Sequence, residues 1–150
     1  MIAESPVFSS ERVPSVWDEI YPLFLEHHAE IGEIKDLPLD PNCEAYKNLD
    51  ALGMVRVYIA REEGKIIGYC VFFISQSMHY KQIKDAVQDI VFINKDHRGF
   101  GKKFMEWCDE ELRKEGVNVI HRYSSSERDL GPIYKRNGYD FKALVYSRRF

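Results

Sequence analysis

A glycine-rich segment between an expected strand and an expected helix is the part of the sequence best suited to bind a ligand. It reads Asp-His-Arg-Gly-Phe-Gly-Lys-Lys over residues 96–103. Its two glycines let the backbone turn tightly and approach a ligand closely, and the helix start that follows offers unpaired N–H groups and a partial positive charge. Three basic side chains add full charges: Arg98, Lys102 and Lys103. The segment therefore predicts an anion site, most naturally for phosphate.

The spacing of these residues excludes two common nucleotide-binding motifs. A P-loop needs Gly-Lys-Ser/Thr after four intervening residues, and the dinucleotide fingerprint needs three glycines near the start of a fold. Residues 96–103 contain neither pattern. Many strand-to-helix turns contain glycine for their geometry alone, so the sequence leaves that simpler explanation open.

A carboxylate lies in the strand expected just before this segment. The alternation of residues 87–93 predicts that Val87, Asp89, Val91 and Ile93 share one face of that strand. Burial among apolar neighbours would raise the pKa of Asp89 toward a value useful for a general base. The alternative is an ordinary ion pair between Asp89 and a nearby Arg or Lys.

The periodicity of the apolar residues indicates which elements hold these groups in place. Helices are expected at 14–28, 43–52, 100–114 and 132–136, and strands at 55–60, 66–74, 87–93, 117–120 and within 139–150. Asn137-Gly138 is a left-handed stop for the last helix. This order of elements predicts the α/β (α+β) class, with one central mixed sheet flanked by helices.

Length and composition limit the class of protein. A chain of 150 residues forms one domain, 1–150, with a core that needs no disulfide. It has no apolar run long enough to span a membrane, and residues 1–6 do not resemble a signal peptide, so a soluble, cytoplasmic protein is expected. The cysteines and histidines match no metal-ligand spacing, so no metal is expected.

The charge is unevenly distributed along the chain. Residues 1–50 hold eleven acidic and three basic residues, whereas residues 51–150 hold thirteen acidic and eighteen basic ones. The net charge of −3 argues against a general nucleic-acid binder. An acidic first third and a basic remainder suggest one surface for a cation and one for an anion, although a solvated surface of uneven composition would look the same.

A second segment follows the glycine-rich one by about one strand and one helix. It reads Ile-Tyr-Lys-Arg-Asn-Gly-Tyr-Asp-Phe over residues 133–141. Together the two segments resemble the GNAT family of acyl-CoA-dependent N-acetyltransferases. In that family an Arg/Gln-x-x-Gly-x-Gly/Ala turn, matched here by Arg98, Gly101 and Lys103, precedes a helix that ends in a Tyr and a Gly-aromatic pair. The resemblance implies a single GNAT-like domain with a mostly antiparallel sheet, in which two parallel strands separate at a cofactor cleft.

The resemblance also implies acetyl-CoA, or coenzyme A, as the bound co-substrate. The pyrophosphate would lie on the glycine turn, and backbone groups of the preceding strand would meet the pantetheine arm. The implied contacts are Val91, Phe92, Ile93, Arg98, Gly99, Phe100, Gly101, Lys102, Lys103 and Ser126. Lys103 departs from the small residue usual in the family, and its ammonium would compensate with direct charge. Ser126 belongs to a serine run where the family often has an Asn.

Acetyl transfer from a thioester to an amine requires a neutral amine, a polarised carbonyl and a proton for the leaving sulfur. The resemblance assigns Tyr134 to protonating the sulfur and Asp89 to removing the amine proton. His121 and water are alternative bases, and the alternative explanation of Tyr134 is an aromatic residue that packs its helix on the sheet.

The acceptor implied by the resemblance is a primary amine, either on a small molecule or on a protein lysine or N-terminus, attacked directly in a ternary complex. A catalytically silent module that binds CoA and regulates a partner is the main alternative, and an unrelated phosphate sensor is another. Strand edges near the C-terminus also leave a homodimer open.

Overall fold

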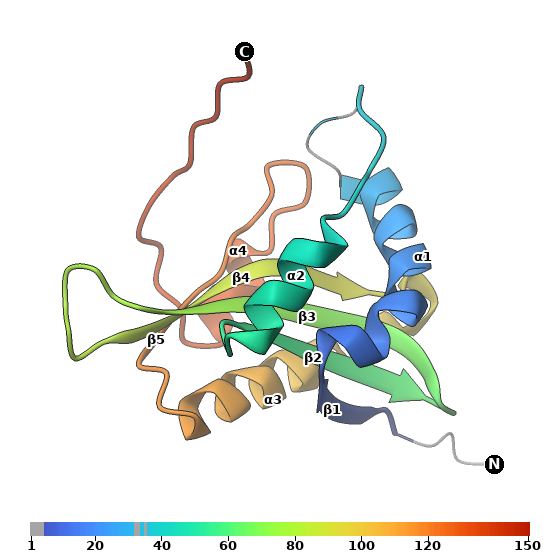
Figure 1. Cartoon of the computed structure of the whole chain (residues 1–150), viewed down its shortest axis with the longest axis horizontal. Helices are drawn as coiled ribbons and strands as arrows, with labels where there is room; N and C mark the ends of the chain where they lie inside the picture. The colour runs from blue at the N-terminus through green and yellow to red at the C-terminus, as the bar shows by residue number, and fades with distance from the viewer. Residues whose placement is uncertain (1–4, 32–33, 35) are drawn as a thin grey trace.

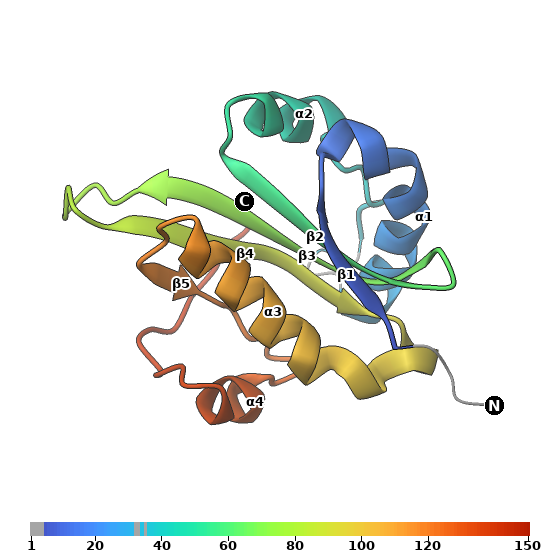
Figure 2. The same cartoon turned by 90° about the horizontal axis from the view of Figure 1, so that it is seen from below.

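One central sheet carries two helices on each face (Figures 1 and 2). A computed structural model describes residues 5–31, 34 and 36–150. The elements in chain order are β1 (Val7–Glu11), α1 (Val13–Ile31), α2 (Cys43–Ala51), β2 (Val55–Glu62), β3 (Lys65–Gln76), β4 (Lys84–Ile93), the 3₁₀ helix η1 (Lys95–Phe100), α3 (Gly101–Lys114), β5 (Val119–His121) and α4 (Gly131–Arg136). Figure 2 shows α1 and α2 on one face of the sheet and α3 and α4 on the other.

The sheet has five strands in the order β1-β2-β3-β4-β5. Strands β1 to β4 pair antiparallel, whereas β5 runs parallel to β4. The predicted α/β (α+β) class with a mixed, mostly antiparallel sheet is therefore confirmed.

Two apolar clusters, one on each face, bury the sheet. On one face α1 places Val16, Ile20 and Phe24 against the sheet at the spacing of an amphipathic helix. On the other face α3 contributes Phe104 and the two buried residues that follow it along the same face, Cys108 and Leu112. Because both faces are covered, β3 reads as a nearly continuous apolar run rather than as an alternation. Among the described residues, no helix is long and apolar enough to cross a membrane.

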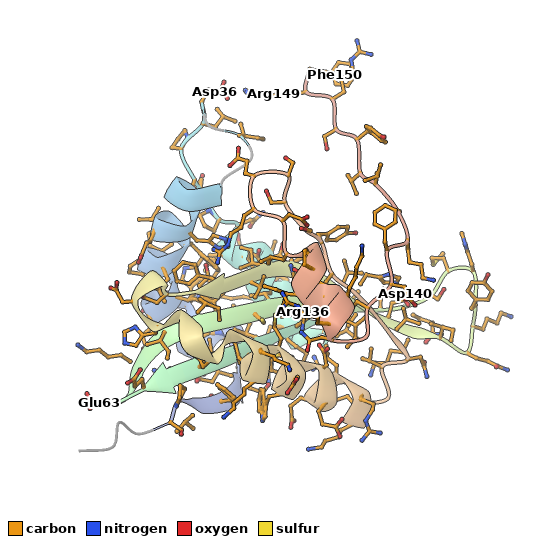
Figure 3. The ribbon with its side chains drawn as sticks, turned by 180° about the vertical axis from the view of Figure 1, so that it is seen from behind. Asp36, Glu63, Arg136, Asp140, Arg149 and Phe150 are labelled. Atoms are coloured by element: carbon orange, nitrogen blue, oxygen red, sulfur yellow. The ribbon has the colours of Figure 1, made fainter. Side chains whose placement is uncertain are left out.

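The two ends of the chain differ from the sequence-based prediction. The polar run at Val7–Glu11 has a weak strand pattern, yet it forms the edge strand β1. The strand expected within 139–150 is wrong, because that segment is irregular and exposed from Asp140 onward. Figure 3 shows it running from Asp140 to Arg149, which forms an ion pair with Asp36. A run with high β-propensity becomes a strand only where a neighbouring edge completes its hydrogen bonds, and this segment pairs with none of the described strands.

A buried arginine joins four parts of the α3 face. The side chain of Arg122, just after β5, has no exposed surface and lies 2.7 Å from Asp109 of α3. Its other nitrogens donate to Gln88 of β4 at 2.9 Å and to the Tyr139 hydroxyl at 3.0 Å. Tyr139 in turn donates to Asp109 at 2.7 Å. Burial alone would lower the pKa of Arg122, but the negative groups around it outweigh burial and raise that pKa, so the guanidinium stays charged.

Replacing Arg122 by Leu should therefore destabilise the fold strongly. Asp109 and Gln88 would lose their charged partner, and breaking a buried pair on one side typically costs about 3 kcal/mol or more. Urea unfolding followed by circular dichroism measures the loss. Arg113→Leu is the matched control, because its ion pair with Glu110 is exposed and the free energy of unfolding should stay close to that of the wild type. Equal losses in the two variants would contradict a structural role for the buried network.

Candidate active site

The two parallel strands separate soon after they meet. β5 pairs with β4 over three positions and the last pair is Val87 with His121, but β4 continues to Ile93. Along 88–93, no described strand covers the β4 edge that faces away from β3. Asn94 donates its N–H to the carbonyl of Ile67 in β3, and the two-residue period of a strand then turns the N–H groups of Val91 and Ile93 toward the open edge. This edge leads directly into η1 and the start of α3.

A β-bulge lies where the strands separate. Gln88 pairs with Phe72 and Ile90 pairs with Val71, so Asp89 is an extra residue without an opposite partner on β3. The prediction that Asp89 shares one face with Val91 and Ile93 is therefore wrong. Those two residues pack in the α3-side cluster, whereas Asp89 contacts α2 on the other face. The extra residue shifts the side-chain alternation by one position, and simple periodicity cannot anticipate such a shift.

The carboxylate of Asp89 is half-buried, and its partner is a neutral hydroxyl rather than a Lys or Arg. Tyr46 of α2 donates its Oη proton to Oδ2 of Asp89. Burial raises the pKa of the Asp89 carboxyl above its ordinary value, and the bond from Tyr46 opposes part of that increase. A carboxylate in this environment accepts a proton more readily than an exposed aspartate does.

Tyr134 lies on the opposite side of the gap between the strands. It is buried in α4, and its hydroxyl donates to the backbone carbonyl of Tyr123 at 2.9 Å. The Arg122 guanidinium is 6.0 Å from the Tyr134 ring centroid. Burial raises the pKa of Tyr134, and the positive charge of Arg122 acts in the opposite direction. The hydroxyl therefore keeps its proton at neutral pH. The nearby Arg122 guanidinium would stabilise the phenolate oxygen if that proton left.

The glycines of the 96–103 segment are not required by the fold. Gly101 has helical angles, φ −54° and ψ −41°, which any residue adopts, and a Cβ there would meet only Ile93 Cγ1 at 3.8 Å. A Cβ on Gly99 would meet nothing within 4 Å. By contrast, Gly138 has φ +87° and ends α4, as its sequence position predicts. The explanation that Gly99 and Gly101 serve only turn geometry therefore loses its support, and open space for a close ligand remains.

The first turn of α3 follows η1 directly and has no side-chain cap. Phe100 is its N-cap residue and supplies no side-chain hydrogen bond to the helix start. The Phe100 ring instead packs against Phe8 and Phe104, with centroids 6.2 Å away in each case, and so anchors the turn to the core. Lys102 and Lys103 are exposed, and Lys102 lies 3.8 Å from Glu106.

Three other residues that the sequence predicts for the site also lie around this region. Ser126 is exposed in the loop before α4. His121 is at the last β4–β5 pair, 3.6 Å from the Asp85 carboxylate, so the alternative base already has an acidic neighbour. The backbone of Arg98 belongs to η1, while its side chain is outside the described part of the chain. Within that described part, no group of three or more His, Cys, Asp or Glu is arranged to hold a metal ion.

Sequence reasoning missed two residues that shape this region, Tyr46 and Arg122. Tyr46 is forty-three residues from Asp89 in sequence, and nothing in its helix distinguishes it from a packing aromatic. Arg122 looks like an ordinary surface base after a short strand. Only the tertiary arrangement reveals that one holds the bulge carboxylate and the other is buried beside Tyr134.

A family model described as an acetyltransferase (GNAT) domain matches residues 54–140, which is more than half of the chain. The chain belongs to the GNAT acetyltransferase family. The matched region contains β2 to α4, and with them the open edge, the glycine turn and both candidate catalytic side chains. No curated protein sequence matches this GNAT chain significantly.

Solved GNAT structures share the fold at low sequence identity. A ribosomal-protein-alanine N-acetyltransferase from Brucella melitensis biovar Abortus 2308 superposes with a TM-score of 0.72 at 15% identity, covering 96% of this chain and 99% of that one. Glucosamine-6-phosphate N-acetyltransferase from Arabidopsis thaliana gives 0.73 at 18%, covering 98% and 99%. A predicted acetyltransferase from Clostridium acetobutylicum, solved with acetyl-CoA, gives 0.69 at 12%, covering 97% and 96%.

The raised pKa of Asp89 predicts a pH-dependent cost to stability. Because the native pKa exceeds the ordinary 3.8, the folded state binds this proton more tightly than the unfolded chain does. Stability from this group is therefore lost as the pH rises from 3.8 through the native pKa, and the loss persists at neutral pH. Asp89→Asn, whose amide oxygen still accepts from Tyr46, should be more stable than the wild type at neutral pH, as measured by urea unfolding.

This advantage of Asp89→Asn should shrink when unfolding is measured well below pH 3.8. Asp40→Asn, at an exposed carboxylate, controls for the removal of one negative charge. A stability gain in Asp89→Asn that is the same at both pH values would show that the gain does not come from ionisation of Asp89.

Proposed function

We propose that this GNAT chain is an acetyl-CoA-dependent N-acetyltransferase that acetylates a primary amine by direct attack within a ternary complex. The observation that carries the proposal is the open edge of β4, which leads into a turn whose glycines the fold does not require. An exposed backbone edge followed by a helix start without a side-chain cap suits a long ligand with an amide-bearing arm and a pyrophosphate.

The anionic end of acetyl-CoA would be held by the glycine turn and the first turn of α3. Gly99 and Gly101 permit close backbone approach, and Arg98, Lys102 and Lys103 supply positive charge. The pantetheine arm would use the outward N–H groups of Val91 and Ile93, and Ser126 would contribute from the facing loop. Phe92 lies between these two and is buried against the α1 side, so its part is to hold the strand in place. The bound group supplies an activated acetyl thioester.

Asp89 would act as the general base on the amine. Its carboxylate takes one proton from the acceptor ammonium, and the freed nitrogen lone pair forms the C–N bond at the thioester carbonyl. The half-buried environment of Asp89 and its raised pKa favour this proton transfer near neutral pH. His121 and water remain alternatives, and the Asp89→Asn rate profile would distinguish them.

Tyr134 would give its proton to the sulfur as the C–S bond breaks, and the second proton lost by the nitrogen would restore it. For this step the hydroxyl exchanges its present acceptor, the Tyr123 carbonyl, for the sulfur. The nearby Arg122 guanidinium would stabilise the transient phenolate. Neither Asp89 nor Tyr134 becomes acetylated in this scheme, so direct transfer needs no acyl-enzyme intermediate.

The acceptor would be a cation before it reacts, either a small amine or a protein lysine or N-terminus. The structurally similar proteins include a glucosamine-6-phosphate N-acetyltransferase and a ribosomal-protein-alanine N-acetyltransferase. The fold alone therefore does not select between a small-molecule acceptor and a protein acceptor. The acidic first third, with Asp36, Asp40 and Glu44 in and after the α1–α2 connection, favours a positively charged acceptor. A cytoplasmic location and a homodimer would be compatible with this role.

A regulatory module that binds CoA without turnover is the second candidate, because Lys103 replaces the small residue usual at its position. Direct charge from the ammonium would preserve affinity while crowding the turn. Detecting CoA release from acetyl-CoA in a panel of primary amines separates the two functions. Tight CoA binding with no release on any amine would favour the regulatory module.

Coenzyme A should stabilise the folded protein, and a side chain at position 101 should abolish most of this effect. At about 100 times its Kd, a ligand adds roughly 2.7 kcal/mol to the free energy of unfolding. In Gly101→Val the new Cβ would meet only Ile93 Cγ1, at 3.8 Å, so binding should weaken far more than stability. Thermal melts with and without coenzyme A measure both quantities. Arg113→Val, at an exposed position in the last turn of α3, controls for a β-branched residue in that helix. Unchanged CoA affinity in Gly101→Val would remove the pyrophosphate from this turn.

Tyr134→Phe should slow acetyl transfer without altering coenzyme A affinity. The ring still packs beneath α4, but the proton for the sulfur is lost, and a general acid typically contributes about 10²- to 10⁴-fold to the rate. Single-turnover measurement isolates the chemical step from product release. Tyr146→Phe, in the exposed C-terminal segment, is the matched control. An unchanged single-turnover rate in Tyr134→Phe would refute the acid role.

A further inference from the structure

The Tyr46 side chain is fixed on both sides before it reaches the bulge. Its helix begins at the Asn42 cap, whose side chain accepts the Ala45 N–H at 3.0 Å. The Tyr46 ring lies 5.8 Å from the Trp17 ring of α1 and is stacked on Phe73 of β3 at 6.1 Å. Two aromatic neighbours on different elements therefore define where the hydroxyl lies. In that position the hydroxyl donates its hydrogen bond to Oδ2 of Asp89.

The hydroxyl of Tyr46 acts as a permanent donor to this carboxylate. Burial, followed by the negative charge of Asp89, raises the pKa of Tyr46 well above its ordinary value of 10.0. The phenol thus remains protonated over the range in which an aspartate titrates, and it can donate to the ionised carboxylate. A hydrogen bond to a charged group favours the charged form. Burial of Asp89 works in the opposite direction, so Tyr46 offsets part of the cost of ionisation.

We infer that Tyr46 is the positioning residue of the proposed base: by holding Oδ2 of Asp89 it leaves Oδ1 directed to the acceptor amine and keeps the carboxylate ionised and ready to take a proton. This inference rests on the proposed function. The described contacts of Asp89 engage Oδ2 alone, and the bulge gives this residue no opposite partner on β3 that could orient it instead. Tyr46 therefore supplies an orientation that the strand does not.

Other titratable groups on this side of the sheet stay in place when only the Tyr46 oxygen is removed. Tyr69 of β3 faces the same region, and its hydroxyl lies 3.2 Å from Nδ1 of His27 on α1. Burial is the main cause that raises the pKa of Tyr69, and the charges of Tyr46, Asp89 and Glu26 add to it in that order. Since Tyr69, His27 and Glu26 are unchanged in Tyr46→Phe, a change in the titration of Asp89 would report the missing hydroxyl.

The test compares Tyr46→Phe with Tyr21→Phe in the full chain. Both substitutions remove one phenolic oxygen from a ring that packs on Trp17, but Tyr21 is 39% exposed and lies 6.4 Å from that ring. The first readout is the Asp89 carboxyl titration by ¹³C NMR, assigned with Asp89→Asn, which requires no substrate. The second is the pH dependence of kcat/KM on an amine found in the CoA-release panel.

Tyr46→Phe should raise the Asp89 pKa by about one unit, because a hydrogen bond to a charged group is lost. The acidic limb of kcat/KM should move to higher pH by the same amount, while coenzyme A affinity stays near that of the wild type. The melting temperature at neutral pH should fall modestly, because a higher pKa of Asp89 adds to the cost of ionising it in the folded state. Tyr21→Phe should move neither curve. At pH values above both limbs, any remaining loss of kcat in Tyr46→Phe reports the lost orientation of Oδ1.

Three results would overturn parts of this scheme separately. If the Asp89 titration is the same in Tyr46→Phe and the wild type, Tyr46 does not control the carboxylate, whatever the enzyme does. If the titration moves but the rate profile does not, Tyr46 holds Asp89 but Asp89 is not the base, so the positioning role in catalysis is refuted. A chain that binds coenzyme A but acetylates no amine refutes the proposed function while the NMR result still decides the contact.

Discussion

The buried charge of Arg122 is the constraint on which the α3 side of the molecule depends. A guanidinium without solvent must find acceptors for its N–H groups, and the chain supplies them from β4, from α3 and from Tyr139 beyond the end of α4. Three elements distant in sequence thus have one common partner. Since β5 has only three pairs with β4, these contacts add to a short ladder in holding the chain just past β5, where the two strands separate.

The separation of the strands in turn creates the proposed site. If β5 followed β4 to its end, the outward N–H groups of Val91 and Ile93 would be used within the sheet. Instead the edge is free on the way to the glycine turn, and Asp89 and Tyr134 lie on opposite sides of the gap. One buried ion pair and one short ladder therefore determine both the space for a ligand and the placement of the side chains around it.

Most helices and strands could be predicted from the sequence, because the patterns that indicate them are local. The α3 helix follows from the apolar spacing of Phe104, Cys108 and Leu112, and the β2–β3 hairpin follows from its apolar runs and the intervening turn. The glycine turn was visible as well, although only the structure shows that its glycines are not needed for backbone geometry. Residues 139–150 show the limit of this reasoning, since local β-propensity does not supply a neighbouring strand.

The site could be predicted only in part, because its decisive contacts are long-range. Asp89 was found as a carboxylate in an apolar strand, but the side of the sheet that it faces depends on an unpaired residue that leaves no mark in composition. Tyr46 and Arg122 were invisible for the same reason: their roles are defined by partners on other elements. The Tyr134 prediction rested on family resemblance, and its role in proton delivery is still a proposal.

The bulge in β4 interrupts the regular strand pairing at the residue that supplies the proposed base, Asp89. A deletion of the single residue at position 89 would restore uninterrupted pairing along β3 and β4, and it would bring Ile90 into step with the residues before it. Such a shorter chain would have a more regular sheet and no carboxylate beneath α2. The carboxylate therefore comes at the cost of one break in the regular ladder between β3 and β4.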